Sequence, residues 1–244
     1  MHTIGFSTGA LAKGDFLAGA SIAQRLELSA IELSALRDSE LAPLLRTIPN
    51  LSLDSFRYVS VHAPSKLGNI LEPDLVHALR GLPPEWPIIV HPDVIRDFSS
   101  WRFLGSRLCL ENMDQRKSLG RTVAEMEFVF ERLPDAGFCF DIGHARQVDP
   151  TMGIAISMLQ RFRSRLTQVH MSEVDPKGVH IPISFAAMHG FQLAAKLIPE
   201  DCPIILESTV RGRAIEREIN VARSVLEPRV REEEYGGFGG ARSR

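Results

Sequence analysis

The chain has 244 residues, of which 44% are hydrophobic, so it is long enough to enclose one large core. Its formal net charge is -2, with acidic and basic residues interspersed, which argues against a surface built to bind nucleic acid. The three cysteines lack CxxC spacing and cannot all pair, and no apolar run reaches the roughly 18 residues of a membrane helix. We therefore expect a soluble protein of the reducing cytoplasm with no membrane segment.

Eight short apolar runs alternate along the chain with eight stretches of helical periodicity. The runs are almost continuously apolar, as in strands of a parallel sheet that is covered by helices. The expected strands cover residues 3–7, 30–33, 58–62, 87–91, 107–111, 138–141, 166–170 and 203–207. The expected helices cover residues 15–28, 39–48, 74–82, 93–104, 122–133, 149–162, 184–197 and 214–226. Residues 171–183 are expected to form a polar loop.

Eight strand-helix units in about 225 residues fit a closed (β/α)₈ TIM barrel, an α/β fold with a single domain. A doubly wound open sheet is the alternative, but its site would lie at one switch point instead of around a ring of strand ends. We expect residues 1–227 to form the barrel. Residues 228–244 combine a charge run with glycines, which is typical of a flexible tail. The pattern leaves open whether the barrel forms a homodimer.

Six of the expected strands end on a histidine or a carboxylate. These residues are His62, His91, Glu111, Asp141, His170 and Glu207. In a (β/α)₈ barrel the carboxyl ends of the strands meet above the barrel mouth, so the six side chains should share one cavity. His144 follows Asp141 by three residues, and His180 lies in the loop after the seventh strand. A single histidine at a strand end is more often a core residue than a ligand. The prediction therefore rests on the occurrence of all these residues together at the strand ends.

Imidazole nitrogens and carboxylate oxygens together are ligands for a divalent ion such as Zn²⁺ or Mn²⁺. The set contains no thiolate, which argues against a structural zinc site and favours an open, catalytic centre. Three carboxylates in one cavity would also repel each other, and a cation removes that cost. Cys109 and Cys139 each lie two residues before an expected ligand, so they should point into the barrel as packing residues.

Three further residues are candidates for binding the substrate. Glu32 is a carboxylate within the second apolar run, so it must face the cavity or bridge to a cation at the rim. Lys66 follows the third strand, on the face where the site is expected. Arg211 follows the eighth strand, and barrels often hold phosphate near the last two strands. Lysines and arginines in such loops are more often solvated surface charges than substrate ligands, and this interpretation also applies to Lys66 and Arg211.

Short motifs at successive strand ends carry a resemblance to a known superfamily. They are SVHAPS at 60–65, VHPD at 90–93, LEN at 110–112, FDIGHA at 140–145, VHMSEVD at 169–175, HIPI at 180–183 and LES at 206–208. With these motifs in this order, the chain resembles the xylose isomerase-like TIM barrel superfamily over nearly all of residues 1–227. That superfamily includes sugar-phosphate isomerases and epimerases and apurinic-site nucleases of the endonuclease IV type (AP endonuclease family 2).

The resemblance implies ligand sets that differ between the two branches. The isomerase and epimerase branch holds one divalent ion with four residues, whose counterparts here are Glu111, Asp141, His170 and Glu207. His144 matches the histidine of that branch that contacts the substrate. In the nuclease branch Glu111 would bridge two ions, and the additional ligands would be His62, His91, His144 and His180. The resemblance thus implies one to three divalent ions per chain, with Zn²⁺ or Mn²⁺ favoured and Mg²⁺ as the alternative.

The chain departs from each branch at one informative position. The nuclease pattern has an aspartate two residues before the position of His180, where this chain has Gly178. The epimerases carry a further glutamate six residues after the ligand of the fifth strand, where Lys117 stands here. The first departure argues against a third metal ion, and the second argues against inferring a particular keto-sugar as substrate.

The residues and the resemblance together favour a metal-dependent isomerase or epimerase acting on a small polyhydroxylated carbonyl compound, such as a sugar or sugar phosphate. The reaction would pass through a metal-chelated enediolate, with Glu111 and Glu207 transferring the proton and His144 orienting a hydroxyl. The alternative is a phosphodiesterase of the endonuclease IV type with several metal ions, for which nucleic acid would be the partner. A barrel that only binds a ligand is the third hypothesis, and the nearly complete set of charged strand ends argues against it.

Overall fold

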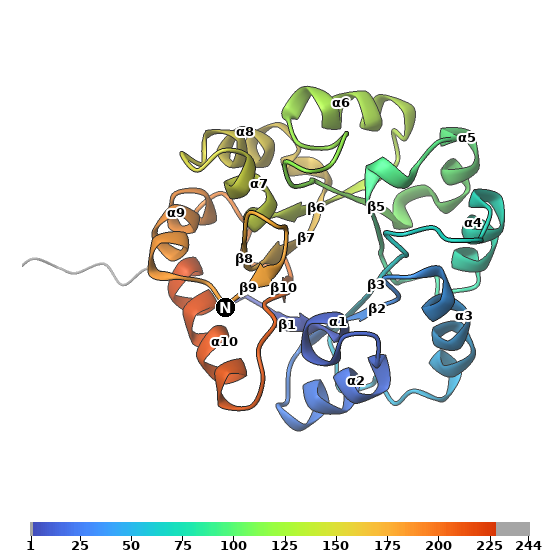
Figure 1. Ribbon diagram of the computed structural model, residues 1–244, viewed down its shortest axis with the longest axis horizontal. Helices are drawn as coiled ribbons and strands as arrows, with labels where there is room; N and C mark the ends of the chain where they lie inside the picture. The colour runs from blue at the N-terminus through green and yellow to red at the C-terminus, as the bar shows by residue number, and fades with distance from the viewer. Residues whose placement is uncertain (1, 228–244) are drawn as a thin grey trace, which may run out of the picture.

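The structure of the protein is a computed structural model that describes residues 2–227, so the expected tail at 228–244 lies outside the described residues. Eight parallel strands close into a barrel in the order β1-β10-β7-β6-β5-β4-β3-β2 (Figure 1). These strands are β1 (Ile4–Ser7), β2 (Ala30–Ser34), β3 (Tyr58–His62), β4 (Ile88–Val90), β5 (Leu108–Glu111), β6 (Gly137–Asp141), β7 (Leu166–Met171) and β10 (Ile204–Leu206). The predicted (β/α)₈ fold is confirmed.

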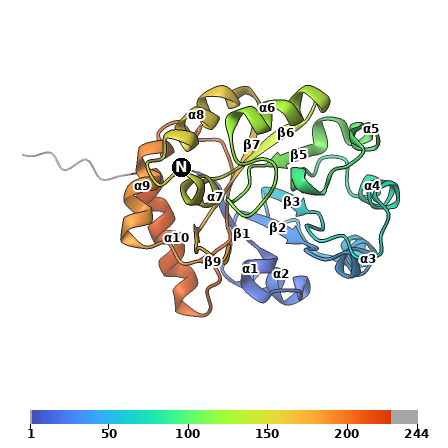
Figure 2. The same ribbon diagram turned by 45° about the horizontal axis from the view of Figure 1, so that its top comes forward.

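Helices surround the strands and form the outer layer of the barrel (Figures 1 and 2). They are α1 (Thr8–Ala12), α2 (Phe16–Arg25), α3 (Asp38–Thr47), α4 (Glu72–Arg80), α5 (Phe98–Trp101), α6 (Val123–Arg132), α7 (Ile142–Val148), α8 (Gly153–Arg161), α9 (Phe185–Ala195) and α10 (Arg213–Leu226). Short 3₁₀ helices cover Ile48–Asn50, Pro92–Val94, Arg102–Arg107 and Arg163–Arg165. None of the described helices combines the length and the apolar character that crossing a membrane requires.

The main core lies between the strands and the helices. Phe138 of β6 is fully buried there and packs against Phe130 of α6 and against Phe162, with ring centroids 6.0 and 5.5 Å apart. The alternate residues of the strands point inward, where Cys109 and Cys139 pack with Ile89 in a small separate cluster. The expectation that the two cysteines face the barrel interior is therefore confirmed.

Residues 93–104 do not form the single helix expected from the sequence. A 3₁₀ turn comes first, and α5 begins only after Asp97, whose side chain accepts a hydrogen bond from the backbone N–H of Ser99 (3.0 Å). Gly105 has a φ of +56°, which is incompatible with a continuing helix. The apolar periodicity of this segment therefore reflects packing of several short turns against the barrel.

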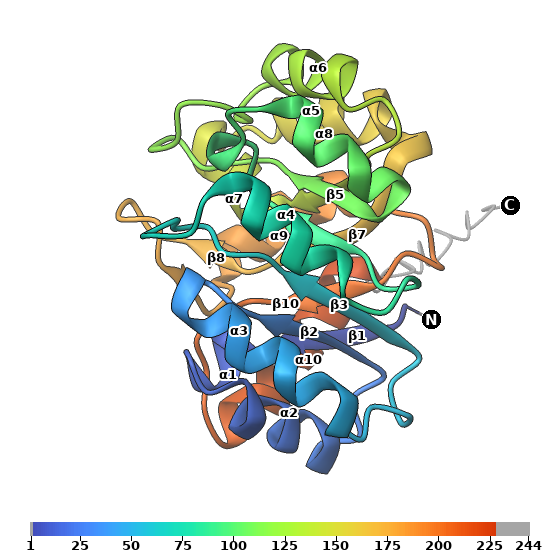
Figure 3. The ribbon, with the colours of Figure 1, turned by 90° about the vertical axis from the view of Figure 1, so that its right-hand side faces the viewer.

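Residues 171–183 were expected as a loop, but they contain an antiparallel hairpin of β8 (Glu173–Val174) and β9 (His180–Ile181). Its turn is organised by Asp175, whose carboxylate accepts hydrogen bonds from the backbone N–H groups of Lys177 (2.8 Å) and Val179 (2.9 Å). In Figure 3 the β8 label and the helices α1 and α7 lie at one end of the barrel, opposite the N-terminus. This is the end to which the carboxyl ends of the strands lead.

Candidate metal centre

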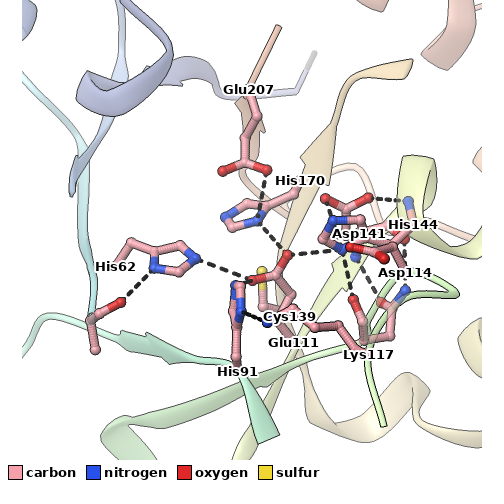
Figure 4. A network of polar contacts seen from close by, with 12 residues as sticks. His62, His91, Glu111, Asp114, Lys117, Cys139, Asp141, His144, His170 and Glu207 are labelled. Atoms are coloured by element: carbon pink, nitrogen blue, oxygen red, sulfur yellow. Dashed lines mark hydrogen bonds and ion pairs between the residues drawn. The ribbon is translucent and has the colours of Figure 1, made fainter. Parts of the chain in front are cut away.

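Glu111, the last residue of β5, lies at the middle of the polar cluster and is buried (Figure 4). Its Oε2 atom lies 3.2 Å from Nε2 of His62 and 3.2 Å from Nε2 of His91. Its Oε1 atom lies 3.3 Å from Nδ1 of His144 and 3.4 Å from Nδ1 of His170. The two oxygens of one carboxylate thus face two different pairs of histidines.

Asp141 ends β6 and also begins α7, the helix that follows it directly. Its Oδ1 atom accepts a hydrogen bond from the backbone N–H of His144 (2.6 Å), so the carboxylate acts as the N-cap of that helix. The side chain of Asn112 brackets the Asp141 backbone, because its amide nitrogen donates to Asp141 O and its amide oxygen accepts from Asp141 N, both at 2.8 Å. Asn112 therefore fixes the position of the Asp141 backbone at the end of β6.

His144 is held at the barrel mouth by the same two strands. Its Nδ1 atom lies 2.9 Å from the backbone oxygen of Asn112 and 3.5 Å from Oδ2 of Asp141. Sequence reasoning assigned no role to Asn112, although its position directly after the Glu111 strand end was visible. An amide that follows a predicted ligand at a strand end is the signal that could have identified it.

Glu207 follows β10 and closes the cluster from the other side of β7. Its Oε2 atom lies 3.5 Å from Nδ1 of His170 and 3.4 Å from Nδ1 of His180. His180 comes from β9, and Oγ of Ser172 lies 2.7 Å from its Nδ1 atom. The hairpin β8–β9 therefore brings the eighth of the predicted ligands to the same cluster.

Several groups in the cluster have strongly shifted pKa values. Burial alone would lower the pKa of His62, but its hydrogen bond with Glu111 and the charges of Glu32 and Glu111 raise it to about 9. Burial likewise opposes the charge on His144, and the carboxylates of Asp141 and Glu111 raise its pKa to about 10. Burial raises the pKa of Asp141 to about 6, although the charge of His144 acts in the opposite direction. Burial lowers the pKa of His91 and of His180 to about 4, so without a metal the protons sit on His62 and His144 and not on these two.

The arrangement fits a divalent cation. Two buried polar atoms at its centre, Oδ2 of Asp141 and Nδ1 of His170, have no hydrogen-bond partner. One ligand atom from each member of the set Glu111, Asp141, His170 and Glu207 lies within 4.8 Å of the others. The same closeness holds for the sets His62, His91 and Glu111; Asp141, His144 and His180; and Glu32, His62 and Glu207. Carboxylate and imidazole donors at this spacing suit Zn²⁺, Mn²⁺ or Mg²⁺.

Lys117 lies beside this cluster, at the position where the epimerases carry a glutamate. Its Nζ atom donates a hydrogen bond to Oδ2 of Asp93 (2.8 Å) and lies 3.5 Å from Nδ1 of His91. The lysine therefore pairs with a carboxylate next to one of the predicted ligands, and it supplies a cation at the edge of the barrel mouth.

The three residues expected to bind substrate occupy three different environments. Glu32 is fully buried beneath the cluster, where its Oε2 atom lies 2.9 Å from Nε2 of His170. Lys66 is exposed and pairs through its backbone with Arg37. Arg211 lines a cavity of about 630 Å³ between α2 and the start of α10. Within residues 2–227, no polar contact joins Lys66 or Arg211 to the strand-end cluster, so their binding roles stay predictions.

Solved structures with the same closed barrel match the chain over most of its length. One is 3-keto-D-glucoside 4-epimerase from E. coli, which is 14% identical with a TM-score of 0.59 and covers 92% of this chain and 100% of its own. A second is the IolI protein with a zinc atom, 13% identical with a TM-score of 0.56 and coverage of 92% and 98%.

A third match is a xylose isomerase-like TIM barrel protein from Mycobacterium smegmatis in complex with magnesium. It is 15% identical, has a TM-score of 0.50 and covers 86% of this chain and 88% of its own. No protein-family model and no curated sequence match the chain. At these identities the structural matches establish the shared fold, and the resemblance predicted from the motifs is confirmed at that level.

Proposed function

We propose that the protein is a metal-dependent isomerase or epimerase that acts on a small polyhydroxylated carbonyl compound of the sugar or sugar-phosphate class. The observation that carries the proposal is the convergence of two glutamates on one histidine. Nδ1 of His170 lies 3.4 Å from Oε1 of Glu111 and 3.5 Å from Oε2 of Glu207. Two carboxylates from non-adjacent strands thus meet in one cavity, an arrangement suited to removing a proton from a substrate carbon with one group and returning it with the other.

Glu111, Asp141, His170 and Glu207 would hold the divalent ion. When bound, the ion would polarise neighbouring carbonyl and hydroxyl oxygens of the substrate and make the intervening C–H group more acidic. Glu111 and Glu207 would accept and return the proton through their carboxylate groups. Asp141 would orient His144 through the N-cap of α7, and the imidazole would in turn orient a substrate hydroxyl.

The structural neighbours support the same class of reaction. The E. coli neighbour is named as a sugar epimerase, and the two other neighbours are described with zinc and with magnesium. At identities of 13 to 15% these neighbours share the fold with this chain, and both the reaction and the substrate are left to experiment.

The test is proton exchange at the substrate carbon. A panel of ketoses, keto-glycosides and their phosphates would be incubated in D₂O with the metal-loaded protein, and loss of the C–H signal would be followed by NMR. Glu207→Gln should slow the exchange by at least about 100-fold. The control is Glu173→Gln, because this glutamate is similarly shielded but pairs with Arg146 outside the cluster. If Glu207→Gln exchanged the proton of an identified substrate as fast as the wild type, the proton-transfer role of Glu207 would be wrong.

A second candidate function has one specific observation in its favour. Oε2 of Glu111 lies 3.2 Å from Nε2 of both His62 and His91, while Oε1 faces His144 and His170. A carboxylate placed between two sets of imidazoles is suited to bridging two cations, as in two-metal phosphodiester hydrolysis.

The discriminating assay uses a DNA duplex that contains one abasic site. Nicking that requires metal, stops with a chelator, and disappears in His62→Ala and in His91→Ala would favour the phosphodiesterase. Under the isomerase proposal, both variants keep their metal at the four-residue set, and the duplex stays intact with the wild-type protein.

A further inference from the structure

Glu32 is a buried carboxylate inside the barrel that lies beneath the proposed centre. It belongs to β2, and strand register places it beside Ser60 of β3. Its Oε2 atom accepts a hydrogen bond from Oγ of Ser60 (3.2 Å) and another from the amide nitrogen of Gln168 (2.8 Å). The same atom lies 2.9 Å from Nε2 of His170.

The orientation of Gln168 is set by a residue on the other side of the barrel. The hydroxyl of Tyr58 donates to the amide oxygen of Gln168 (2.6 Å), so the amide nitrogen is the atom that faces Glu32. Gln168 is fully buried. Tyr58 and Gln168 therefore fix Oε2 of Glu32 as a hydrogen-bond acceptor.

The charge of Glu32 favours one position for the hydrogen of the His170 imidazole. Nε2 of His170 lies 2.9 Å from Oε2 of Glu32 and also 2.8 Å from the amide nitrogen of Gln168, which is a donor. A carboxylate oxygen only accepts hydrogen bonds, and because the charged Glu32 is the stronger of the two partners, it favours hydrogen on Nε2. In a neutral imidazole the other nitrogen, Nδ1, then holds the lone pair. That nitrogen points to Glu111 and Glu207 and has no hydrogen-bond partner.

We propose that Glu32 is a positioning residue, whose carboxylate holds His170 in the tautomer with hydrogen on Nε2 and so presents Nδ1 to a divalent ion. This role rests on the proposed function, because it presupposes a metal at the four-residue set. Carboxylates that receive the second N–H of a ligating histidine typically strengthen metal binding by 10-fold to 100-fold. The role also replaces the substrate contact expected from the sequence, since Glu32 is fully buried behind His170.

Glu32 has one other use to be weighed. Its Oε1 atom is buried without a hydrogen-bond partner, and one of its oxygens lies within 4.8 Å of ligand atoms of His62 and Glu207. A direct ligand and a positioning residue differ in what their removal does. Loss of a ligand set removes an ion, whereas loss of a positioning contact weakens binding of an ion that is still held.

The experiment is a Zn²⁺ titration against a competing chelator, with wild type, Glu32→Gln and Ser60→Ala. Ser60→Ala is the matched control, because it removes a hydrogen bond from Glu32 and leaves the contact with His170 in place. We expect Glu32→Gln to bind the same number of zinc ions about 10-fold to 100-fold more weakly, and Ser60→Ala to stay within about 3-fold of wild type. Unchanged affinity in Glu32→Gln, or loss of one whole equivalent, would overturn the proposal.

A spectroscopic measurement on the wild-type protein covers the case in which Glu32→Gln does not fold. In zinc-loaded protein labelled with ¹⁵N-histidine, the His170 signals should show hydrogen on Nε2 and none on Nδ1. Hydrogen on Nδ1 would contradict the positioning role. Wild-type protein that binds no zinc at all would instead refute the metal centre, so the two failures are distinguishable.

Discussion

Glu111 and His170 face each other at the barrel mouth, with Oε1 of the carboxylate 3.4 Å from Nδ1 of the imidazole. Both side chains are buried, and a lone pair on Nδ1 that faced this oxygen directly would be repelled. Either a proton on the imidazole or a cation between the two atoms relieves that contact. Proton and metal should therefore compete for the same place.

The first prediction concerns protons released when metal binds. Burial opposes a charge on His170, but the charges of Glu207, Glu32 and Glu111 raise its pKa well above its usual value. A divalent ion at the four-residue set must displace that proton, so we expect about one proton released per ion at pH 7.5. Calorimetric titration with Zn²⁺ in buffers of different ionisation enthalpy measures this number. Zinc binding without proton release would contradict a proton on His170 in the metal-free cluster.

The second prediction concerns the stability of the metal-free protein above neutral pH. The pKa values of His62 and His144 are raised to about 9 and about 10 in the folded chain, from an ordinary value of 6.5. Their contribution to stability is complete below pH 6.5 and is lost as the pH rises through 9 and 10. The free energy of unfolding should fall by up to about 1.4 kcal/mol per pH unit for each histidine in this window.

Urea unfolding at several pH values, with and without a chelator, checks this prediction. His62→Asn should flatten the pH dependence in the chelated sample, because it removes one of the two groups. A stability that stays constant from pH 6.5 to 9 in the chelated wild type would contradict the assigned protonation of the cluster.

The third prediction concerns Gly178, where the nuclease pattern has an aspartate. Its φ is +72°, and a Cβ atom there would lie 1.7 Å from Nη2 of Arg116. Arg116 donates hydrogen bonds to Asp114 and to the backbone oxygen of Lys177, so it ties the hairpin β8–β9 to the loop after β5. Gly178→Ala should lower the free energy of unfolding by about 1–2 kcal/mol from backbone strain, and by more because Arg116 must move.

Gly105→Ala is the control for this effect in the same urea unfolding assay. Gly105 also has a positive φ, +56°, but a Cβ atom there meets nothing within 4 Å, so only the backbone strain remains. A stability of Gly178→Ala equal to that of the wild type would contradict the prediction.

The strand-end cluster was predictable from the sequence because each of its residues can be recognised from its immediate neighbours in the chain. Each buried strand is marked by its own apolar run, and the residue that ends the run marks the polar end of the barrel. The hydrogen-bonded layer beneath the cluster has no such signal. Tyr58 and Gln168 are 110 positions apart, and Glu32 and His170 are 138 positions apart, so their contacts depend on closure of the whole barrel.

Helix α7 illustrates a different limit. The same residue, Asp141, ends a strand, caps a helix and supplies a predicted metal ligand, and the sequence analysis assigned only the first and last of these roles. A helix of seven residues also has too few turns to show a full amphipathic stripe in the sequence. The helix expected at 93–104 was a wrong prediction for a different reason. The apolar residues of this segment lie on several short turns that pack against the barrel, and together they imitate the periodicity of one helix.

The metal content of the purified chain tests the central claim most directly. The protein would be prepared without a histidine tag and without chelator, and the metal measured by inductively coupled plasma mass spectrometry. We predict about one equivalent of a divalent ion, kept in His62→Ala and lost in Asp141→Ala. Absence of metal in the wild type after incubation with Zn²⁺, Mn²⁺ and Mg²⁺, or its full retention in Asp141→Ala, would contradict a metal centre built on Glu111, Asp141, His170 and Glu207.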